Sequence, residues 1–535
     1  MNDEFTGPAI EWARLWPLFA VFGTALVGVA VEAFAPRSAR CLIQSSVAGV
    51  GLAVALVGTV LVALELPERA GGAARGDVTA GGAVVVDGPT VFLWGLLVVV
   101  TVGGLLLFAE RRVDAGLPVF AGQASLPPGS TAGPGGPGEP SYEDWEHTEV
   151  YPLLVFALGG MMLFCASGDL LTMFVALEIL SLPLYLLCGL ARRRRLLSQE
   201  AAMKYFLLGA FSSGFFVYGM ALVYGYAGTL NLAGVAVAVR AGGGQEVLLL
   251  VGAAMVMVAL LFKVGAVPFH SWTPDVYQGA PTAVTAYMAA ATKIAAFGAI
   301  LRFLYVGLGD ARWDWAPLLW VVAILTMLGG VVLAVGQTEI KRLLAYSSIA
   351  HTGFLLTGVL GLQASGDLAE GQISSLQAVL FYLATYGVAT VGIFAVTTLV
   401  RDPGGEAGSV ARWTGLGRTS PLVAGAFAVF LLSLAGIPLT AGFVGKWSVF
   451  ASAAGAGAWP VVAVAITSSI IAVYFYVRHI VTMFFADPPE DAPVVVVPSP
   501  LTSVTIAVAL IVTVALGVVP GPLLDLAGHA GQFVR

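Results

Sequence analysis

Long apolar runs, separated by short polar segments, dominate the sequence. A helix needs about 20 apolar residues to cross a bilayer. Fourteen runs reach that length, at 13–35, 42–64, 90–109, 150–167, 169–190, 202–226, 246–269, 281–307, 317–337, 343–362, 375–400, 420–452, 459–484 and 501–521. The run at 420–452 is too long for one straight helix and contains glycine and proline, so we predict one broken span there. The pattern predicts an all-α polytopic membrane protein with about 14 transmembrane helices.

The lysines and arginines in the loops give an orientation. Loops after odd-numbered spans hold thirteen of these residues, and the opposite side holds seven. Cytoplasmic loops carry the excess of positive charge, so both termini are predicted to lie outside.

Composition agrees with this class and excludes several others. The 535 residues are 58% hydrophobic and only 10% charged, whereas soluble domains are about 25% charged. The three cysteines are far apart, and the sequence has no metal-ligand cluster, no P-loop and no GxGxxG after a strand. We therefore expect this chain to bind no haem, iron–sulfur cluster, flavin or nucleotide.

Spans 4–8 and spans 9–13 resemble two copies of one five-helix unit. Spans 7 and 12 each contain a glycine and proline break, and a lysine lies beside each break. Because five is odd, the second copy is inverted relative to the first, as in many transporters. The alternative is that glycine and proline are simply common in membrane helices. The predicted units are a three-helix segment, a Gly/Pro-rich loop, two repeats, and a final helix with its tail, at 1–112, 113–149, 150–308, 317–484 and 501–535.

Four of the five lysines fall inside predicted spans: Lys204, Lys263, Lys293 and Lys446. A charged lysine at the bilayer centre costs about 2.5–3.5 kcal/mol on insertion scales. Burial lowers the pKa of a lysine, whereas arginine remains charged. These lysines are therefore candidates for proton exchange.

The four lysines have different surroundings in the sequence. Lys263 and Lys446 lie next to the two breaks, although a role in helix packing is the alternative for both. Lys293 is in mid-span among small residues that allow close helix approach. Lys204 is near the start of its span. The alternative to proton exchange for this residue is a side chain that extends to the membrane–water interface.

Two further ionisable residues lie within spans. Glu178 is the only carboxylate inside its span, so it is expected to be protonated or paired with a lysine; a static ion pair is the alternative. His351 has hydroxyl side chains nearby and titrates near neutrality; a hydrogen-bonded interior histidine is equally consistent. Together these residues favour a lateral proton relay along the membrane plane.

Three motifs resemble the antiporter-like subunits of respiratory complex I. They are Val-Pro-Phe-His-Ser-Trp-Thr-Pro-Asp-Val-Tyr-Gln-Gly-Ala-Pro-Thr at 267–282, Ile-Lys-Arg-Leu-Leu-Ala-Tyr-Ser-Ser-Ile-Ala-His-Thr-Gly at 340–353, and Leu-Ala-Gly-Ile-Pro-Leu-Thr-Ala-Gly-Phe-Val-Gly-Lys at 434–446. The end of the first motif is most similar to the subunit N branch. The resemblance is strong over about 150–485, whereas the loop at 113–149 departs from the common pattern.

The resemblance implies a proton-translocating subunit of a bacterial NADH–quinone oxidoreductase in the cell membrane. By position, Glu178, Lys204, Lys263, Lys293 and Lys446 match functional residues of the family. The resemblance also implies that NADH, flavin, iron–sulfur clusters and quinone are bound by partner subunits, not by this chain. The expected partners are other membrane subunits and the lipid bilayer, with no nucleic acid. An Mrp-type cation/proton antiporter subunit and a non-pumping membrane scaffold are the alternatives.

Overall fold

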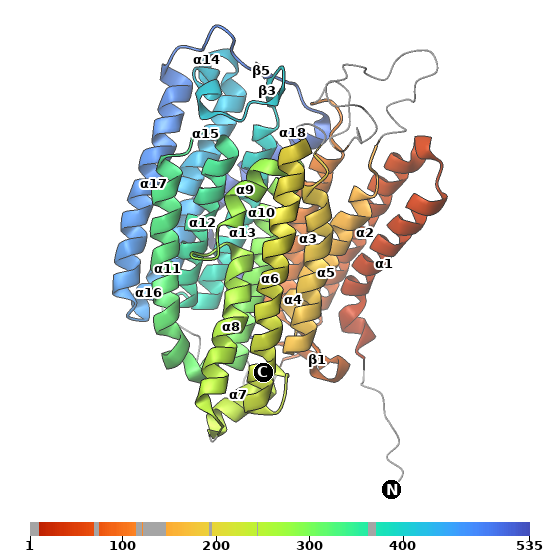
Figure 1. Cartoon of the computed structure of the whole chain (residues 1–535), viewed down its shortest axis with the longest axis vertical. Coiled ribbons are helices and arrows are strands. Elements are labelled where there is room, and N and C mark those ends of the chain that lie inside the picture. The colour runs from red at the N-terminus through yellow and green to blue at the C-terminus, as the bar shows by residue number, and fades with distance from the viewer. Residues whose placement is uncertain are drawn as a thin grey trace.

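The computed structural model describes residues 10–68, 74–113, 120, 146–191, 195–242, 244–361 and 371–534. Helices that run roughly parallel to one another form almost the whole molecule (Figure 1). The order of the elements follows the predicted apolar runs. The all-helical membrane class is therefore confirmed, with two small sheets that the sequence did not predict.

The helices fall into a long and a short group. The long ones are α1 (Trp12–Phe34), α2 (Arg37–Leu64), α3 (Gly88–Phe108), α4 (Val150–Ala166), α5 (Leu170–Cys188), α6 (Arg195–Ala227), α8 (Glu246–Val264), α10 (Thr282–Arg302), α11 (Arg312–Val335), α12 (Ile340–Val359), α13 (Ser375–Thr397), α17 (Trp459–Phe485) and α18 (Pro500–Val518). The shorter ones are α7 (Leu232–Ala241), α9 (Trp272–Gly279), α14 (Leu416–Thr419), α15 (Pro421–Ala435), α16 (Ala441–Gly455) and α19 (Gly521–His529). One π-helical turn, Phe303–Gly307, follows α10.

Two small sheets lie at opposite ends of the bundle. At one end β1 (Gly76–Thr79) pairs antiparallel with β2 (Val84–Asp87). At the other end the order is β4-β3-β5, from β4 (Gly405–Glu406), β3 (Val400–Asp402) and β5 (Val494–Val495). The backbone N–H of Glu11 donates to Thr79, and Gln532 forms a bridge with Ala74. Residues from near both ends of the sequence therefore meet at the first sheet.

In the described part of the chain, eleven helices are long and apolar enough to cross a membrane by themselves. Three of the fourteen predicted runs are not among these eleven, for different reasons. The helix α4 has 17 residues, and the run at 420–452 is divided into α15 and α16. The helix α12 is long enough but carries charged and hydroxyl side chains.

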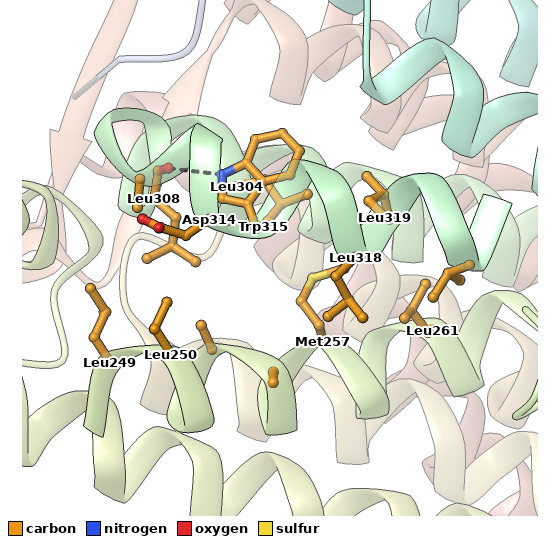
Figure 2. Close-up of a pocket in the computed structure, with 14 residues that line it drawn as sticks. Leu249, Leu250, Met257, Leu261, Leu304, Leu308, Asp314, Trp315, Leu318 and Leu319 are labelled. Carbon is orange, nitrogen blue, oxygen red and sulfur yellow. Dashed lines mark hydrogen bonds between the residues drawn. The ribbon is translucent and has the colours of Figure 1, made fainter. Parts of the chain in front are cut away.

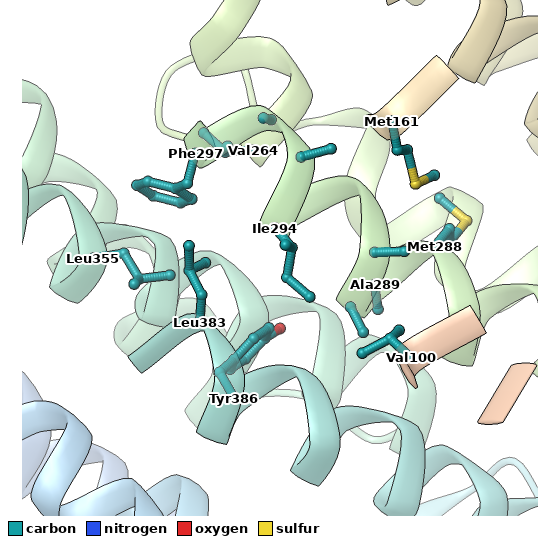
Figure 3. Packing of buried hydrophobic residues seen from close by; sticks show 14 of the residues in the cluster. Val100, Met161, Val264, Met288, Ala289, Ile294, Phe297, Leu355, Leu383 and Tyr386 are labelled. Carbon is teal, nitrogen blue, oxygen red and sulfur yellow. The ribbon is translucent and has the colours of Figure 1, made fainter. Parts of the chain in front are cut away.

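The helices α10 and α13 occupy the middle of the bundle. Every residue of α10 is buried, and every residue of α13 except Gln377 and Val388 is buried. Ile294 of α10 lies close to Leu383 and Tyr386 of α13, with Val100 of α3 nearby (Figure 3). The many alanines of α10 explain this position, since small side chains let neighbouring helices approach closely.

A buried ion pair fixes the end of α10. Arg302 donates to Asp87 over 2.8 Å, and the two side chains are 1% and 0% exposed. Asp87 also caps α3 and accepts from the N–H of Val534. A buried charge is tolerated when it is paired and hydrogen-bonded in this way.

Some predictions fall on residues that the structure does not describe. They include most of the 113–149 loop and five of the arginines counted for the orientation, at 69, 192–194 and 535. The unit boundaries and the inverted relation between the repeats remain predictions.

Candidate functional site

Two interrupted helices end in the same backbone geometry. The helix α8 ends at Gly265 and α15 ends at Gly436, both in the left-handed region, at φ +70° and +81°. In each case the glycine N–H and the following N–H turn back to carbonyls of the last helical turn. This arrangement is a Schellman motif, and it favours glycine at the left-handed position.

The final carbonyl of each interrupted helix receives a different partner. Thr352 of α12 donates its hydroxyl to the carbonyl of Val264 over 2.7 Å. Lys446 of α16 donates its Nζ to the carbonyl of Ala435 over 2.9 Å. Buried carbonyls released at a helix end need such donors. The two lysines have different places at their breaks, because Lys263 precedes its break and Lys446 follows its own.

Lys263 is buried beside α5. Its Nζ donates to the hydroxyl of Ser181 over 2.7 Å, and Ser181 donates to the carbonyl of Leu177. The rings of Tyr185 and Tyr205 lie 5.5 and 5.4 Å from the same nitrogen. The ammonium therefore has a hydroxyl acceptor and two aromatic faces.

Glu178 lies one turn before Ser181 on α5 and is half-buried. Its carboxylate accepts from Ser213 of α6 over 2.5 Å. Among the described residues, no ion pair within 4 Å joins it to Lys263, although the two interact electrostatically. Ser181 thus lies on the same helix face as Glu178 and supplies the direct contact to Lys263.

Lys293 lies at the centre of the bundle and contacts α12 and α13. Its Nζ donates to the carbonyl and the hydroxyl of Ser348, over 2.5 and 2.8 Å. Tyr386 donates to the same hydroxyl over 2.8 Å, and its ring lies 4.7 Å from the lysine nitrogen. Thr352 also donates to the Ser348 carbonyl, over 3.2 Å. Thr352 therefore links the end of α8 to the surroundings of Lys293.

His351 lies between Lys293 and the second break. Its Nδ1 is 2.7 Å from the hydroxyl of Tyr382, and it also interacts with the backbone carbonyl of Leu434 in α15. It interacts electrostatically with both Lys293 and Lys446. Residues three and four apart share a helix face, so Ser348, His351 and Thr352 form one polar face of α12.

Lys446 is buried at the second break. Besides the Ala435 carbonyl, it donates to the hydroxyl of Ser469 in α17 over 3.0 Å, and the ring of Phe354 lies 4.8 Å away. No carboxylate among the described residues lies within 4 Å of Lys263, Lys293 or Lys446. The row therefore consists of buried lysines whose polar neighbours are uncharged.

Comparison with known proteins gives the family. The sequence model of the family described as NADH:quinone oxidoreductase/Mrp antiporter, TM, matches residues 167–472. A NADH-quinone oxidoreductase subunit N from Nocardioides sp. is 64% identical, covering 99% of this chain and all of that protein. The chain belongs to the NADH-quinone oxidoreductase subunit N family. Another subunit N, from Rhodococcus opacus, is 54% identical over 99% of this chain and 97% of its own length.

Solved structures agree with membership of the subunit N family. A chain of respiratory complex I from Thermus thermophilus is 33% identical with a TM-score of 0.74, covering 96% of this chain and all of that one. A chain of the Mrp complex from Dietzia sp. has a TM-score of 0.75 at 25% identity, covering 97% of each chain. The antiporter-like fold is thus common to both groups, whereas the higher identities favour subunit N over the Mrp alternative.

Lys204, which the sequence also predicts as a relay residue, lies apart from the buried row. Its side chain is 41% exposed and forms ion pairs with Glu200, at 2.6 Å, and with Asp275 of α9, at 2.8 Å. Asp275 also pairs with Arg342 of α12, at 2.7 Å. This carboxylate connects α6, α9 and α12.

Sequence reasoning missed Asp275, Ser181 and Tyr386. Asp275 had a signal, because it lies within the motif at 267–282 that carried the family resemblance. Ser181 and Tyr386 had none, since hydroxyl side chains are common in these spans. The described residues contain no group of three or more histidine, cysteine, aspartate or glutamate side chains that could hold a metal ion.

Proposed function

We propose that this chain translocates protons as subunit N of a bacterial NADH–quinone oxidoreductase, and that its buried lysines carry them. The main support is that Lys263, Lys293 and Lys446 are buried with uncharged partners. A scaffold gains nothing from three such residues, because leucine avoids their insertion cost.

The proposed path runs along the membrane plane from α5 to α16. Glu178 supplies a negative charge at one end, with Ser181 between it and Lys263. Thr352 and Ser348 then connect the first break with Lys293. His351 lies between Lys293 and Lys446, so it is the proposed intermediate on the last step.

Coupling to electron transfer is electrostatic in this proposal. Quinone reduction in a neighbouring subunit changes a charge near Glu178, and that change alters how well the protonated form of Lys263 is stabilised. Moving one charge against 100 mV costs about 2.3 kcal/mol. Loss of one nearby opposite charge shifts a pKa by about 1–3 units, or about 1.4 kcal/mol for each unit, so the two energies are comparable.

The finer architecture belongs to the same proposal. The matching Schellman ends of α8 and α15 support two inverted five-helix repeats, at 150–308 and 317–484. Glu11 contacts Thr79 of β1, and Gln532 forms a bridge with Ala74, close to the same sheet. These contacts support two termini on the same side of the membrane. The loop charges predict that this side is the outside. NADH, flavin, iron–sulfur clusters and quinone would be bound by partner subunits.

The decisive experiment is Lys263→Ala in the assembled complex. We expect NADH oxidation with quinone to continue while proton pumping per NADH falls. Lys263→Arg is the matched variant, because it keeps the positive charge but does not release a proton at physiological pH. Co-purification with the NADH-oxidising arm checks assembly. Unchanged pumping per NADH in both variants would refute the relay.

A further inference from the structure

A largely apolar cavity lies between α8 and α11, and none of the three buried lysines lines it. Its volume is about 240 Å³, and thirteen of its fourteen lining side chains are apolar, Asp314 being the exception. Figure 2 shows side chains of both helices pointing into this space. An apolar cavity of about 150 Å³ stays dry and binds benzene, so this larger one suits a hydrocarbon chain.

The outer rim of the cavity faces away from the protein. The lining residues Leu250 and Leu318 are 45% and 52% exposed in this chain. Their neighbours Val251 and Val321 are also exposed. An exposed apolar surface on two membrane-spanning helices lies at the depth of the lipid acyl chains.

The start of α11 lies at the level of the lipid headgroups. Trp313 is 91% exposed there, and exposed tryptophan is typical of the membrane–water interface. The adjacent Asp314 is exposed, and its carboxylate has no hydrogen bond or ion pair to any residue that the structure describes. A free carboxylate above an apolar cavity suits a headgroup that carries an amine.

A cation lies near this end of the cavity, because it pairs with Asp310, the residue before the lining residue Ala311. Arg240 of α7 pairs with Asp310 over 2.9 Å and remains 62% exposed. It can contact a phosphate through its outward nitrogen atoms, since a guanidinium presents five donors. This end of the cavity therefore has an acceptor for an ammonium at its rim and, beyond Ala311 and Asp310, a donor for a phosphate.

We propose that this cavity binds one acyl chain of phosphatidylethanolamine, with the headgroup ammonium on Asp314 and the phosphate near Arg240. The site lies at the junction of the two proposed repeats, because α8 belongs to one and α11 to the other. Leu261 lines the cavity two residues before Lys263. The bound chain thus packs against the last turn of α8. This assignment does not depend on the proposed proton path.

Photo-crosslinking tests the site in the intact complex. The purified complex is placed in phosphatidylglycerol nanodiscs that contain phosphatidylethanolamine with a diazirine in one acyl chain. We expect adducts on peptides from both α8 and α11. Ala254→Phe fills the cavity with an apolar ring and should lower these adducts severalfold, whereas Val251→Phe, on the outer face of the same helix, should not.

Variants of Asp314 test the contact with the headgroup ammonium. Asp314→Asn should abolish the preference for the ethanolamine probe over a phosphatidylglycerol probe, and Asp314→Glu should retain it. Equal labelling by both probes in the unsubstituted complex would overturn the ammonium contact. Absence of adducts on the two helices, or adducts unaffected by Ala254→Phe, would overturn the site itself, as would a crosslink from position 254 to a neighbouring subunit.

Discussion

The two interrupted helices have the same ending but different means of completing it. At the first break, Thr352 holds the free carbonyl of Val264 and Lys263 is left to contact Ser181. At the second, Lys446 itself holds the free carbonyl of Ala435 at 2.9 Å, and the hydroxyl of Ser469 donates to the same carbonyl over a longer 3.5 Å. The first break separates the structural donor from the titratable group, whereas the second combines them in one side chain.

This difference shows that a repeated backbone does not imply repeated chemistry. Release of a proton from Lys263 leaves the hydrogen bonds of the first break intact. Release of a proton from Lys446 removes the charge from the group that satisfies the second break, and hydrogen bonds from charged donors are the stronger ones. We therefore expect the second break to change conformation with protonation more than the first.

The largest expected effect distinguishes the two lysines directly. Lys446→Met should abolish most proton pumping and also raise hydrogen exchange around 436–441, because the Ala435 carbonyl then loses its charged donor and keeps only the longer hydrogen bond from Ser469, at 3.5 Å. Lys263→Met should abolish pumping to a similar extent but leave exchange around 265–271 unchanged. Pumping per NADH and peptide-level hydrogen exchange measure both effects. Equal exchange changes at the two breaks would contradict the comparison.

The next effect concerns Thr352. Thr352→Val removes the donor to the Val264 carbonyl and should destabilise the first break by about 1–3 kcal/mol. Hydrogen exchange should increase around 265–271 and remain unchanged around 436–441. Thr357→Val is a suitable control on the same helix, because that hydroxyl bonds to its own helix and to a methionine sulfur. If the control raises exchange at the first break as much, Thr352 has no specific role there.

A smaller effect is expected for the two glycines. Alanine at either position costs about 1–2 kcal/mol, since both have left-handed backbones. An added methyl at Gly436 would lie 2.9 Å from Cδ of Lys446, whereas at Gly265 it would lie 2.7 Å from the hydroxyl of Thr273. Gly436→Ala should therefore reduce pumping per NADH more than Gly265→Ala at similar complex yield. The reverse order would show that Lys446 tolerates displacement.

The smallest effect is a difference in response to acid. Glu406 accepts from Thr282 at the start of α10 and pairs with Lys341. Burial raises the pKa of Glu406, but Lys341, Thr282 and Arg401 more than offset this, so its pKa is below the ordinary value. The stabilisation is present above the ordinary carboxyl pKa and is lost as pH falls through the lowered value.

Lys446 has a carbonyl and a hydroxyl as partners, and neither of these titrates in acid. Acidification below the ordinary carboxyl pKa should therefore raise exchange around 280–285 and leave 436–441 unchanged, after correction for intrinsic rates. Glu406→Gln should remove the pH dependence at 280–285. A dependence that persists in this variant would assign it to another carboxylate.

The sequence predicted the positions of the buried charges better than their partners. Apolar length and glycine–proline pairs locate Lys263 and Lys446 at helix breaks, because these are local properties of the chain. The contact between Lys293 and Ser348 joins residues 55 positions apart. Periodicity does not specify such a contact, since it depends on how α10 and α12 pack. For the same reason, the sequence did not predict that Ser181, and not Glu178, supplies the direct contact to Lys263.

The complete burial of α10 has a consequence for how the protein is made. This helix is the least apolar of the eleven long ones and carries both Lys293 and Arg302. The partner of Arg302, Asp87, has already been synthesised when α10 emerges, whereas the partner of Lys293, Ser348, follows 55 residues later. A lysine at the helix centre disfavours release from the translocon into lipid by about 2.5–3.5 kcal/mol. We therefore expect insertion of α10 to be completed jointly with α12 and α13, so that the two halves are made as one unit.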